Sequence, residues 1–273
     1  DQCAPRPATL IEDTDLDGVE EIYQHNGILQ AIIKLDSFAS ICELDAYQLN
    51  HNFGDTLRCQ VEHYYQKMQL GTHSPPNLET TGIASAHDRI SYKHQIAAED
   101  TEADDHPKSL FVDRLDGEFI VYQHESSAVE NNGFRSDHAQ LPIRKNISLD
   151  QNRLHVAYHF SGQMKQIFTT EINLAMPSCD GMGGRYVYQG KIPGGFGQLL
   201  ELTHLTEIIL DDDTLGGSVV LRTSYPVTLR AYPHYSVSQS ESGFEKIMQA
   251  VTLQVECPTP AQGLNITLEI NAR

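Results

Sequence analysis

The sequence has 273 residues and a formal net charge of -18 when histidine is counted as neutral. That length is enough to bury a large core, and it fits one large β domain as well as two small ones. The negative charge repels phosphate backbones and anionic lipid, which argues against nucleic-acid binding and against docking on a membrane surface. No apolar run of about 18 residues is present, so no membrane-spanning helix is expected.

The chain begins at Asp1, without a methionine and without a basic, apolar leader. We therefore expect a fragment cut from a longer protein, or a processed product, and no signal peptide. Its five cysteines are widely spaced and form no CxxC pair, which argues against a zinc clip or a redox pair. Reduced, mostly buried thiols in the cytoplasm are the expected state.

In chain order, strand signals dominate: short apolar and β-branched runs stand between Gly, Pro and Asp turns. In residues 154–160 the apolar side chains alternate onto one face. The predicted strands cover residues 28–35, 118–124, 154–160, 166–174, 205–210, 218–223, 226–232, 250–257 and 264–270. Short strands at this spacing indicate an all-β sandwich or barrel.

One stretch, residues 55–70, has apolar residues at the three- to four-residue spacing of a helix, although a strand followed by a loop fits equally well. Residues 71–84, which contain Pro75-Pro76, and the acidic run 97–107 are predicted loops. No polar linker divides the chain. The prediction is a single domain over residues 1–273 with at most one or two short helices.

The sharpest local motif is the acidic run DTDLDGVEE, from Asp13 to Glu21. Carboxylates at every second position followed by Gly suit a hard cation, because alternation lets the side chains converge and Gly permits a tight turn. Position 12 of an EF-hand loop would be Gln24, which departs from that pattern, whereas the loop resembles shorter acidic loops between β-strands. The predicted ligands of a structural Ca²⁺ are Asp13, Asp15, Asp17, the Val19 carbonyl and Glu21. The alternative is an acidic β-turn without a metal.

The histidines form no HExxH and no HxH spacing. Those considered for a sugar cleft are His63, His87, His94, His204 and His234. The Gly-rich segment 180–197 lacks a phosphate-binding motif, but its Tyr186, Tyr188 and Phe196 could stack on sugar rings. His63, Tyr186 and His234 are retained as candidate substrate-binding residues. The alternatives are ordinary surface or hydrogen-bonded histidines and a long connection between strands.

No catalytic residue is assigned. No GxSxG is present, and the carboxylates are too numerous for a glycoside-cleaving pair to be singled out. The chain has no Trp, which weakens the case for a stand-alone sugar-binding module.

Four spaced motifs resemble the C-terminal part of glycoside hydrolase family 57, the α-amylases and 4-α-glucanotransferases. The most specific is the stretch 233–251, which resembles a closing SQSE-G-(F/W) block. Asn173-Leu174-Ala175 is similar to a strand that reads FNLA, residues 15–22 to a D-x-DG-x-EE opening, and residues 62–65 to EHYH. The resemblance runs from about Pro7 to the end of the chain.

In those enzymes an N-terminal (β/α)7 barrel carries the catalytic nucleophile Glu and the acid/base Asp, and a supersandwich similar to galactose mutarotase follows. The resemblance implies that this chain is that sandwich. The partner would be the barrel of the same polypeptide, with α-glucan and a second copy of the chain as further contacts. The family often has a DHF segment near the position of residues 110–114, but here Asp113 has no His after it, so a role of that segment does not carry over.

Three functions of different classes remain. The expected one is a non-catalytic accessory domain of an α-glucan-processing enzyme. The alternatives are a mutarotase-like enzyme, which needs a His acid and a Glu base that the sequence does not pair, and a free carbohydrate-binding module.

Overall fold

The computed structural model describes residues 7–54, 56–65, 96–125, 132–138, 141–162, 165–240 and 243–273. In chain order the strands are β1 (Ala8–Glu12), β2 (Glu21–His25), β3 (Leu29–Lys34), β4 (Ile41–Ala46), β5 (His51–Asn52), β6 (Leu110–Leu115), β7 (Glu118–Phe119), β8 (Gln123–His124), β9 (Asn132–Ser136), β10 (Ile143–Asp150), β11 (Arg153–Phe160), β12 (Ile167–Leu174), β13 (Gly184–Tyr188), β14 (Lys191–Gly195), β15 (Leu200–Asp212), β16 (Gly217–Ser240), β17 (Gly243–Pro258) and β18 (Leu264–Ala272). A short 3-10 helix, η2 (Ala98–Thr101), lies in the acidic run that was predicted as a loop. Among the described residues, no helix has the length and apolar character that crossing a bilayer requires.

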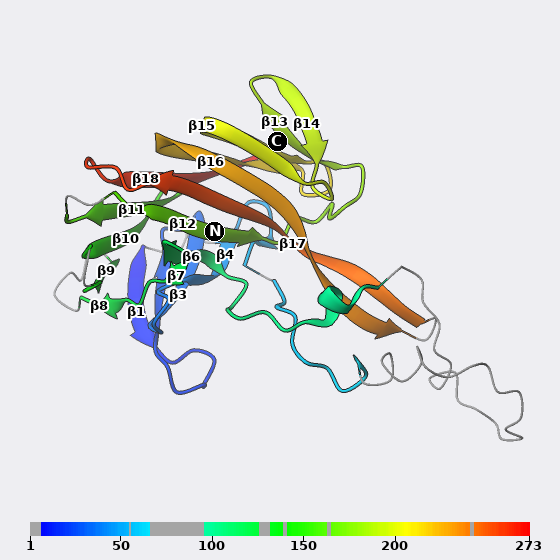
Figure 1. Cartoon of the computed structure of the whole chain (residues 1–273), viewed down its shortest axis with the longest axis horizontal. Coiled ribbons are helices and arrows are strands. Elements are labelled where there is room, and N and C mark those ends of the chain that lie inside the picture. The colour runs from blue at the N-terminus through cyan, green and yellow to red at the C-terminus, as the bar shows by residue number, and fades with distance from the viewer. Residues whose placement is uncertain are drawn as a thin grey trace, which may run out of the picture. The chain divides into compact units, whose positions relative to one another are not determined.

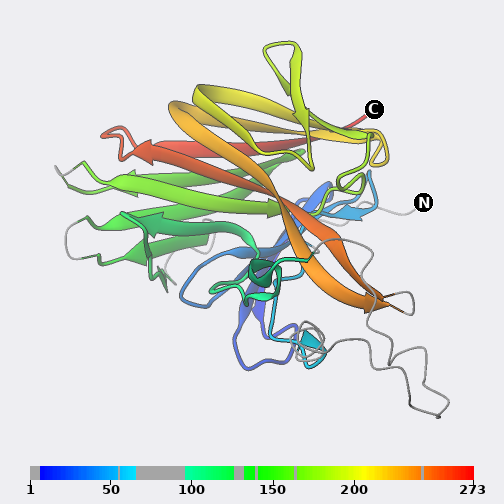
Figure 2. The same ribbon diagram turned by 45° about the vertical axis from the view of Figure 1, so that its right-hand side comes forward.

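The strands form two runs of antiparallel neighbours. One run is β1-β2-β3-β4-β6-β12-β17. The other is β9-β10-β11-β18-β16-β15-β13-β14. The strands of the two runs lie beside one another in Figures 1 and 2. The strand spacing left a sandwich or a barrel open, and the family resemblance implied a sandwich; the all-β sandwich is confirmed.

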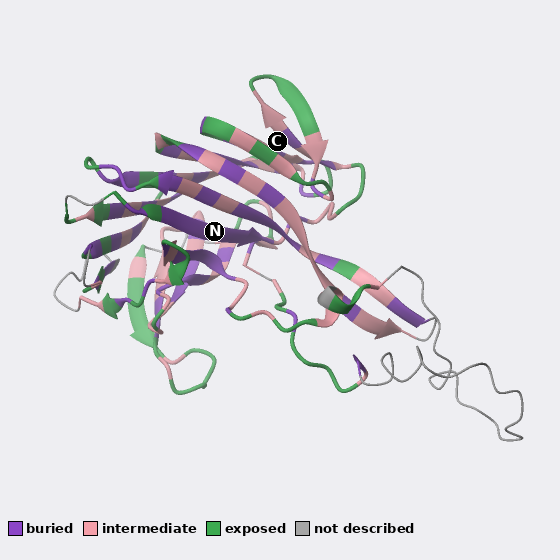
Figure 3. Cartoon of the chain, in the orientation of Figure 1, coloured by how far each residue is buried: buried purple, intermediate pink, exposed green. Residues whose placement is uncertain are grey.

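The core lies between these two runs. Along β11 buried residues alternate with more exposed ones, as Figure 3 shows, because successive side chains of a strand point to opposite faces. Strand β12 is buried from Phe168 to Leu174 on both of its faces. The Tyr158 ring on β11 packs against Phe168 on β12 with 4.7 Å between ring centroids, so aromatic side chains join the two runs.

The contacts of the chain define two compact units. The larger comprises residues 1–56, 108–233 and 250–273, and the smaller comprises residues 57–107 and 234–249. In the smaller unit the buried residues Cys59, Tyr65, Val237 and Phe244 form a small core. The Tyr65 hydroxyl donates to the Val237 carbonyl at 3.2 Å. That residues 1–273 fold as a single domain stays a prediction.

The predicted helix over residues 55–70 is not formed over residues 56–64, and Tyr65 is the one described residue of this stretch that is helical. Thr56 to Glu62 have no regular structure, and residues 66–70 lie outside the described chain. Leu57 and Val61, on the supposed apolar face, are 61% and 79% exposed, while Cys59 is buried. Apolar spacing in this stretch therefore does not mark a buried helix face.

Two other expectations changed in detail. The predicted strand 118–124 is split into β7 and β8, since Ile120 turns back to donate to the Asp113 carbonyl at 3.0 Å. The predicted strands 218–223 and 226–232 are parts of one long strand, β16, which tolerates the exposed Pro226 at a position without a ladder partner on β15.

Candidate metal centre

The acidic run forms the connection between β1 and β2, which pair antiparallel with Glu12 opposite Glu21. The Asp13 carboxylate accepts hydrogen bonds from the N–H groups of Asp17 at 3.1 Å and Gly18 at 3.0 Å. Gly18 has a φ of 90°, which favours glycine. The loop is thus folded around its own carboxylates, as short Asp side chains beside free backbone N–H groups allow.

Three of the predicted ligands come together. Asp13, Asp15 and Glu21 each place a carboxylate oxygen within 4.8 Å of the others. Glu21 is only 1% exposed, and its Oε2 accepts hydrogen bonds from the N–H and the hydroxyl of Thr14, at 2.8 and 2.7 Å. Its Oε1 is buried and accepts no hydrogen bond within the described chain. A buried carboxylate oxygen without such a partner is costly, and a cation in the cluster would supply one.

Lys34, which no sequence motif marks, contributes a cation of its own to this cluster. Its Nζ lies 2.8 Å from Asp15 Oδ2, 2.7 Å from Asp17 Oδ2 and 3.7 Å from Glu21 Oε1. Partial burial alone would lower the pKa of Lys34, but the hydrogen bonds to Asp15 and Asp17 raise it above its usual value. The only signal for Lys34 is the strand register, which sets it opposite Glu21 across β2 and β3.

The other two predicted ligands have different roles in this structure. Asp17 pairs with Lys34, and that hydrogen bond, with one from the Val19 N–H at 2.8 Å, lowers the pKa of Asp17. Val19 contributes its N–H to the loop, as the donor to Asp17, whereas its carbonyl was the predicted ligand. The oxygen donors of Asp13, Asp15 and Glu21 fit a hard divalent ion, provided that the Lys34 ammonium moves aside.

The candidate histidines do not gather into one site. His63 is an exposed turn residue, and His204 is exposed on β15 at an irregularity of the ladder, with a φ of 56°. His234 is 11% exposed, with its Nε2 at 3.1 Å from the Leu57 carbonyl and 3.5 Å from Asp104 Oδ2, so its ring holds neighbouring segments of the smaller unit. His87 and His94 lie outside the described residues.

Tyr186 cannot stack on a sugar in this structure, which corrects the prediction made for it. Its ring is fully buried and packs edge-to-face against the equally buried Phe196 at 5.3 Å. The Gly-rich segment forms the hairpin β13–β14, and two of its aromatic rings serve the core because they lie on inward-facing positions. Tyr188 is partly buried.

The segment 110–114 closes a polar network in the core. Lys145 on β10 and Asp113 on β6 are fully buried and lie 2.8 Å apart. The hydroxyls of Tyr122 and Tyr158 donate to Asp113 at 3.0 and 2.9 Å, and Lys145 also donates to the Phe111 carbonyl at 2.7 Å. Burial lowers the pKa of Lys145 and raises the pKa values of both tyrosines well above their usual range. Every charge has partners and none faces solvent, so this network serves the fold.

The two-layer arrangement and the acidic β1–β2 connection define an all-β sandwich domain. The chain belongs to the family described as "Alpha-amylase/4-alpha-glucanotransferase, C-terminal", whose model matches residues 13–134 and 117–270. This confirms the resemblance seen in the spaced motifs.

Individual relatives agree with that family. The chain is 23% identical to a 4-alpha-glucanotransferase of Thermococcus kodakarensis over 94% of its own length and 40% of the relative. It is 24% identical to an alpha-amylase of Pyrococcus furiosus, over 89% of the chain and 37% of the relative. The crystal structure of 4-alpha-glucanotransferase from Thermococcus litoralis superposes with a TM-score of 0.65 at 20% identity, over 98% of this chain and 40% of that one, and shows the same fold. The chain thus spans about two fifths of the length of these relatives.

Proposed function

We propose that the chain acts as the non-catalytic C-terminal domain of an α-glucan-processing enzyme. It would support the catalytic barrel of the same polypeptide and contact α-glucan. The observation that carries this proposal is the family match over nearly the whole chain, combined with coverage of only 40% of the Thermococcus kodakarensis relative. The alternatives of a mutarotase-like enzyme and a free carbohydrate-binding module lack a comparable family match.

A fusion experiment tests the supporting role. The matching C-terminal part of the Thermococcus kodakarensis 4-alpha-glucanotransferase is deleted, and this chain is fused in its place. We expect the truncated enzyme to lose most of its glucan transfer from maltotriose and the fusion to recover a measurable part. A fusion that is folded by circular dichroism but no more active than the truncated enzyme would count against the role.

The chain alone provides the second arm of this test. We expect it to show no glucan transfer, no amylose hydrolysis and no acceleration of glucose mutarotation above the buffer rate. Turnover that disappears in a histidine-to-alanine variant would instead establish an enzyme.

We also propose that the β1–β2 connection binds a structural Ca²⁺ through Asp13, Asp15 and Glu21. The support is the buried Glu21 Oε1, which accepts no hydrogen bond from the described residues, and the three converging carboxylates. Since an ion that binds only the folded state stabilises it by RT ln(1 + [L]/Kd), saturating Ca²⁺ at about 100 times Kd would add about 2.7 kcal/mol. The bound ion would stabilise the fold and would take no part in catalysis.

Calorimetric titration with Ca²⁺ tests this site. Two variants are expected to change the affinity for Ca²⁺ in opposite directions. Asp15→Asn removes one charged ligand and should abolish the heat of binding. Lys34→Met removes the competing ammonium and should tighten binding at least several-fold, since like charges no longer meet. If the parent chain and both variants show no heat of binding and no shift in melting temperature with Ca²⁺, the calcium proposal is refuted.

A cytoplasmic location and a homodimer complete the proposal. The four described cysteines, Cys42, Cys59, Cys179 and Cys257, are free thiols. Burial raises the pKa values of Cys42 and Cys257 to about 12, which keeps these thiols protonated and unreactive. The dimer rests on the family resemblance, and sedimentation equilibrium would test it.

A further inference from the structure

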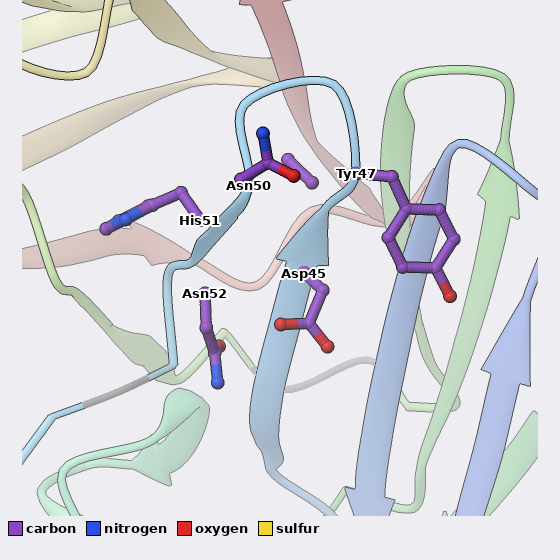
Figure 4. A pocket seen from close by; sticks show the side chains of 6 residues that line it. Asp45, Tyr47, Asn50, His51 and Asn52 are labelled. Carbon is purple, nitrogen blue, oxygen red and sulfur yellow. The ribbon is translucent and has the colours of Figure 1, made fainter.

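A small pocket opens beside the hairpin of β4 and β5, within the larger unit. Its volume is about 330 Å³, near the lower end of the range for ligand pockets, about 300–1,000 Å³. It is lined by Asp45, Ala46, Tyr47, Asn50, His51 and Asn52. Figure 4 shows Asp45 and Asn52 side by side on the two strands, with Tyr47 on one side of them and His51 on the other.

The Asp45 side of the pocket is held in place by a chain of hydrogen bonds. The hydroxyls of Tyr23 and Tyr47 both donate to Gln30 Oε1, at 2.6 and 2.8 Å, which uses both lone pairs of that oxygen. Gln30 Nε2 then donates to Asp45 Oδ2 at 2.7 Å. Asp45 Oδ1 accepts no hydrogen bond from the described residues, so a positioned carboxylate oxygen is left for a ligand. Partial burial raises the pKa of Asp45.

Asn52 supplies a donor beside this acceptor. The strand register sets Asn52 directly opposite Asp45. Asn52 Oδ1 accepts hydrogen bonds from the N–H groups of Leu44 at 3.2 Å and Gly54 at 2.8 Å, so the network orients the amide. The Nδ2 group, with two N–H donors, makes no hydrogen bond within the described chain.

His51 and Tyr47 complete the lining. His51 Nε2 lies 2.7 Å from the Ala175 carbonyl, which can only accept, so Nε2 carries a proton and donates to that carbonyl. Tyr47 is 36% exposed and offers part of an aromatic surface. The turn that joins these residues is fixed at Asn50, whose φ of 48° suits the small polar side chain of Asn.

The chemistry of the lining selects the ligand. Asp45 makes the pocket negative, which disfavours phosphate, sulfate or carboxylate groups. An acceptor on Asp45 next to a donor on Asn52 matches two neighbouring hydroxyls, because each hydroxyl donates one hydrogen bond and accepts others. The apolar faces of a sugar ring pack on aromatic surface such as that of Tyr47.

We propose that this pocket binds one sugar ring of an α-glucan chain, with Asp45 and Asn52 holding two neighbouring hydroxyls. The sugar ring follows from the pocket, whereas the choice of α-glucan rests on the proposed function. The pocket lies apart in sequence from the acidic connection 13–21 and from the candidate residues His63, Tyr186 and His234.

Calorimetric titration of the 273-residue chain with maltotriose tests this proposal through an exchange of the two groups. Asp45→Asn keeps an oxygen for Gln30 but turns the acceptor that faces the pocket into a donor. Asn52→Asp keeps an oxygen for Leu44 and Gly54 but turns the donor into an acceptor. Asp45→Asn should bind at least about tenfold more weakly, as expected when a hydrogen bond to a charged group is lost. Asn52→Asp should also bind more weakly, because two acceptors then face the sugar hydroxyls.

The double variant Asp45→Asn/Asn52→Asp restores one donor and one acceptor in exchanged positions. Because sugar hydroxyls can reverse their roles, it should recover most of the lost affinity, which a merely structural effect of the single changes would not do. The matched control Asp150→Asn, an exposed carboxylate on β10, should bind like the parent chain. Tri(ethylene glycol), which has no neighbouring hydroxyls, serves as the control ligand and should not bind.

Three results would overturn the pocket: no maltotriose binding by the parent chain, unchanged affinity in both single variants, or equal binding of tri(ethylene glycol). The assay does not depend on the fusion enzyme. A chain that binds maltotriose through Asp45 and Asn52 but fails to restore glucan transfer would keep the pocket and refute the supporting role. A chain that restores glucan transfer but does not bind maltotriose would keep the supporting role and refute the pocket.

Discussion

Lys145 and Asp113 form an ion pair in the core, where charged groups have lost their contact with water. The pair joins β10 to β6, and hydrogen bonds from Tyr122 and Tyr158 and to the Phe111 carbonyl satisfy its remaining groups. Removing one partner of a buried pair leaves the other charge uncompensated. We expect Lys145→Met to lower the free energy of unfolding by about 3–5 kcal/mol, measured by urea denaturation.

Two further variants make this prediction specific. Lys191→Met removes an exposed lysine on β14 and should change the free energy of unfolding by less than about 0.5 kcal/mol. Lys145→Met combined with Asp113→Leu removes both charges and should be more stable than Lys145→Met alone. A loss below about 1 kcal/mol in the single variant would show that the pair contributes little.

In two ion pairs between strands, Lys145–Asp113 and Lys34–Glu21, the sequence marked the carboxylate but not the lysine. Asp113 stood out within the segment 110–114, and Glu21 within the acidic motif. Lys145 and Lys34 did not stand out, because an ion pair between strands depends on register and layer packing. One local signal was available: Lys145 lies between Ile143 and Ile147 on the buried face of β10, where a lysine needs a partner.

The hairpin β13–β14 shows why glycine is needed at one position of the Gly-rich segment. A Cβ on Gly184 would meet Phe196 Cδ2 at 2.2 Å and Cε2 at 2.6 Å. Phe196 is fully buried, so its ring cannot swing aside. We expect Gly184→Ala to lower the free energy of unfolding by about 1–3 kcal/mol, the usual cost of overpacking, in the same urea assay.

A double-variant cycle identifies Phe196 as the cause. Phe196→Leu leaves a smaller side chain over Gly184, so Gly184→Ala should cost less in that background than in the parent chain. A coupling of more than about 0.5 kcal/mol is expected for side chains in direct contact. Strict additivity of the two changes would place the strain elsewhere.

Strand alternation predicted most of the long strands, since inward and outward positions alternate with a period of two along them. The same signal was weak where glycine interrupts it, so β13 and β14 were read as a loop. Over residues 55–70 a helical spacing of apolar residues was present, but Leu57 and Val61 face solvent. Short apolar patterns do not distinguish a helix from an irregular segment that a few buried contacts hold in place.

At the scale of the whole molecule, the count and spacing of the strands predicted a sandwich or a barrel, and the resemblance of the spaced motifs indicated the sandwich and its family. The division into two units was not visible, because the long strands β16 and β17 contribute residues to both units without a break in composition. The pocket at Asp45 and Asn52 was also missed. Its residues are common on surfaces, and only the register of β4 and β5 brings this acceptor and this donor together.

The stability of this acidic chain is expected to fall as its paired carboxylates become protonated at low pH. Paired carboxylates hold surface segments together at neutral pH, and Asp213 is the clearest case. It pairs with Arg185 at 2.8 Å and with Arg273 at 2.7 Å. These two guanidinium groups lower the pKa of Asp213 from 3.8 to about 2.

A pKa that is lower in the folded state than in the unfolded state means that the carboxylate stabilises the fold above the unfolded value. The contribution of Asp213 should therefore be complete above about pH 4 and disappear as the pH falls towards 2. We expect the melting temperatures of the parent chain and of Asp213→Asn to differ most above pH 4 and to converge near pH 2. Thermal melts at fixed ionic strength measure this, with Asp150→Asn as the control for loss of an exposed carboxylate that has no ion pair among the described residues. A constant difference between parent and Asp213→Asn across this range would show that the two arginine pairs do not stabilise the fold through the Asp213 charge.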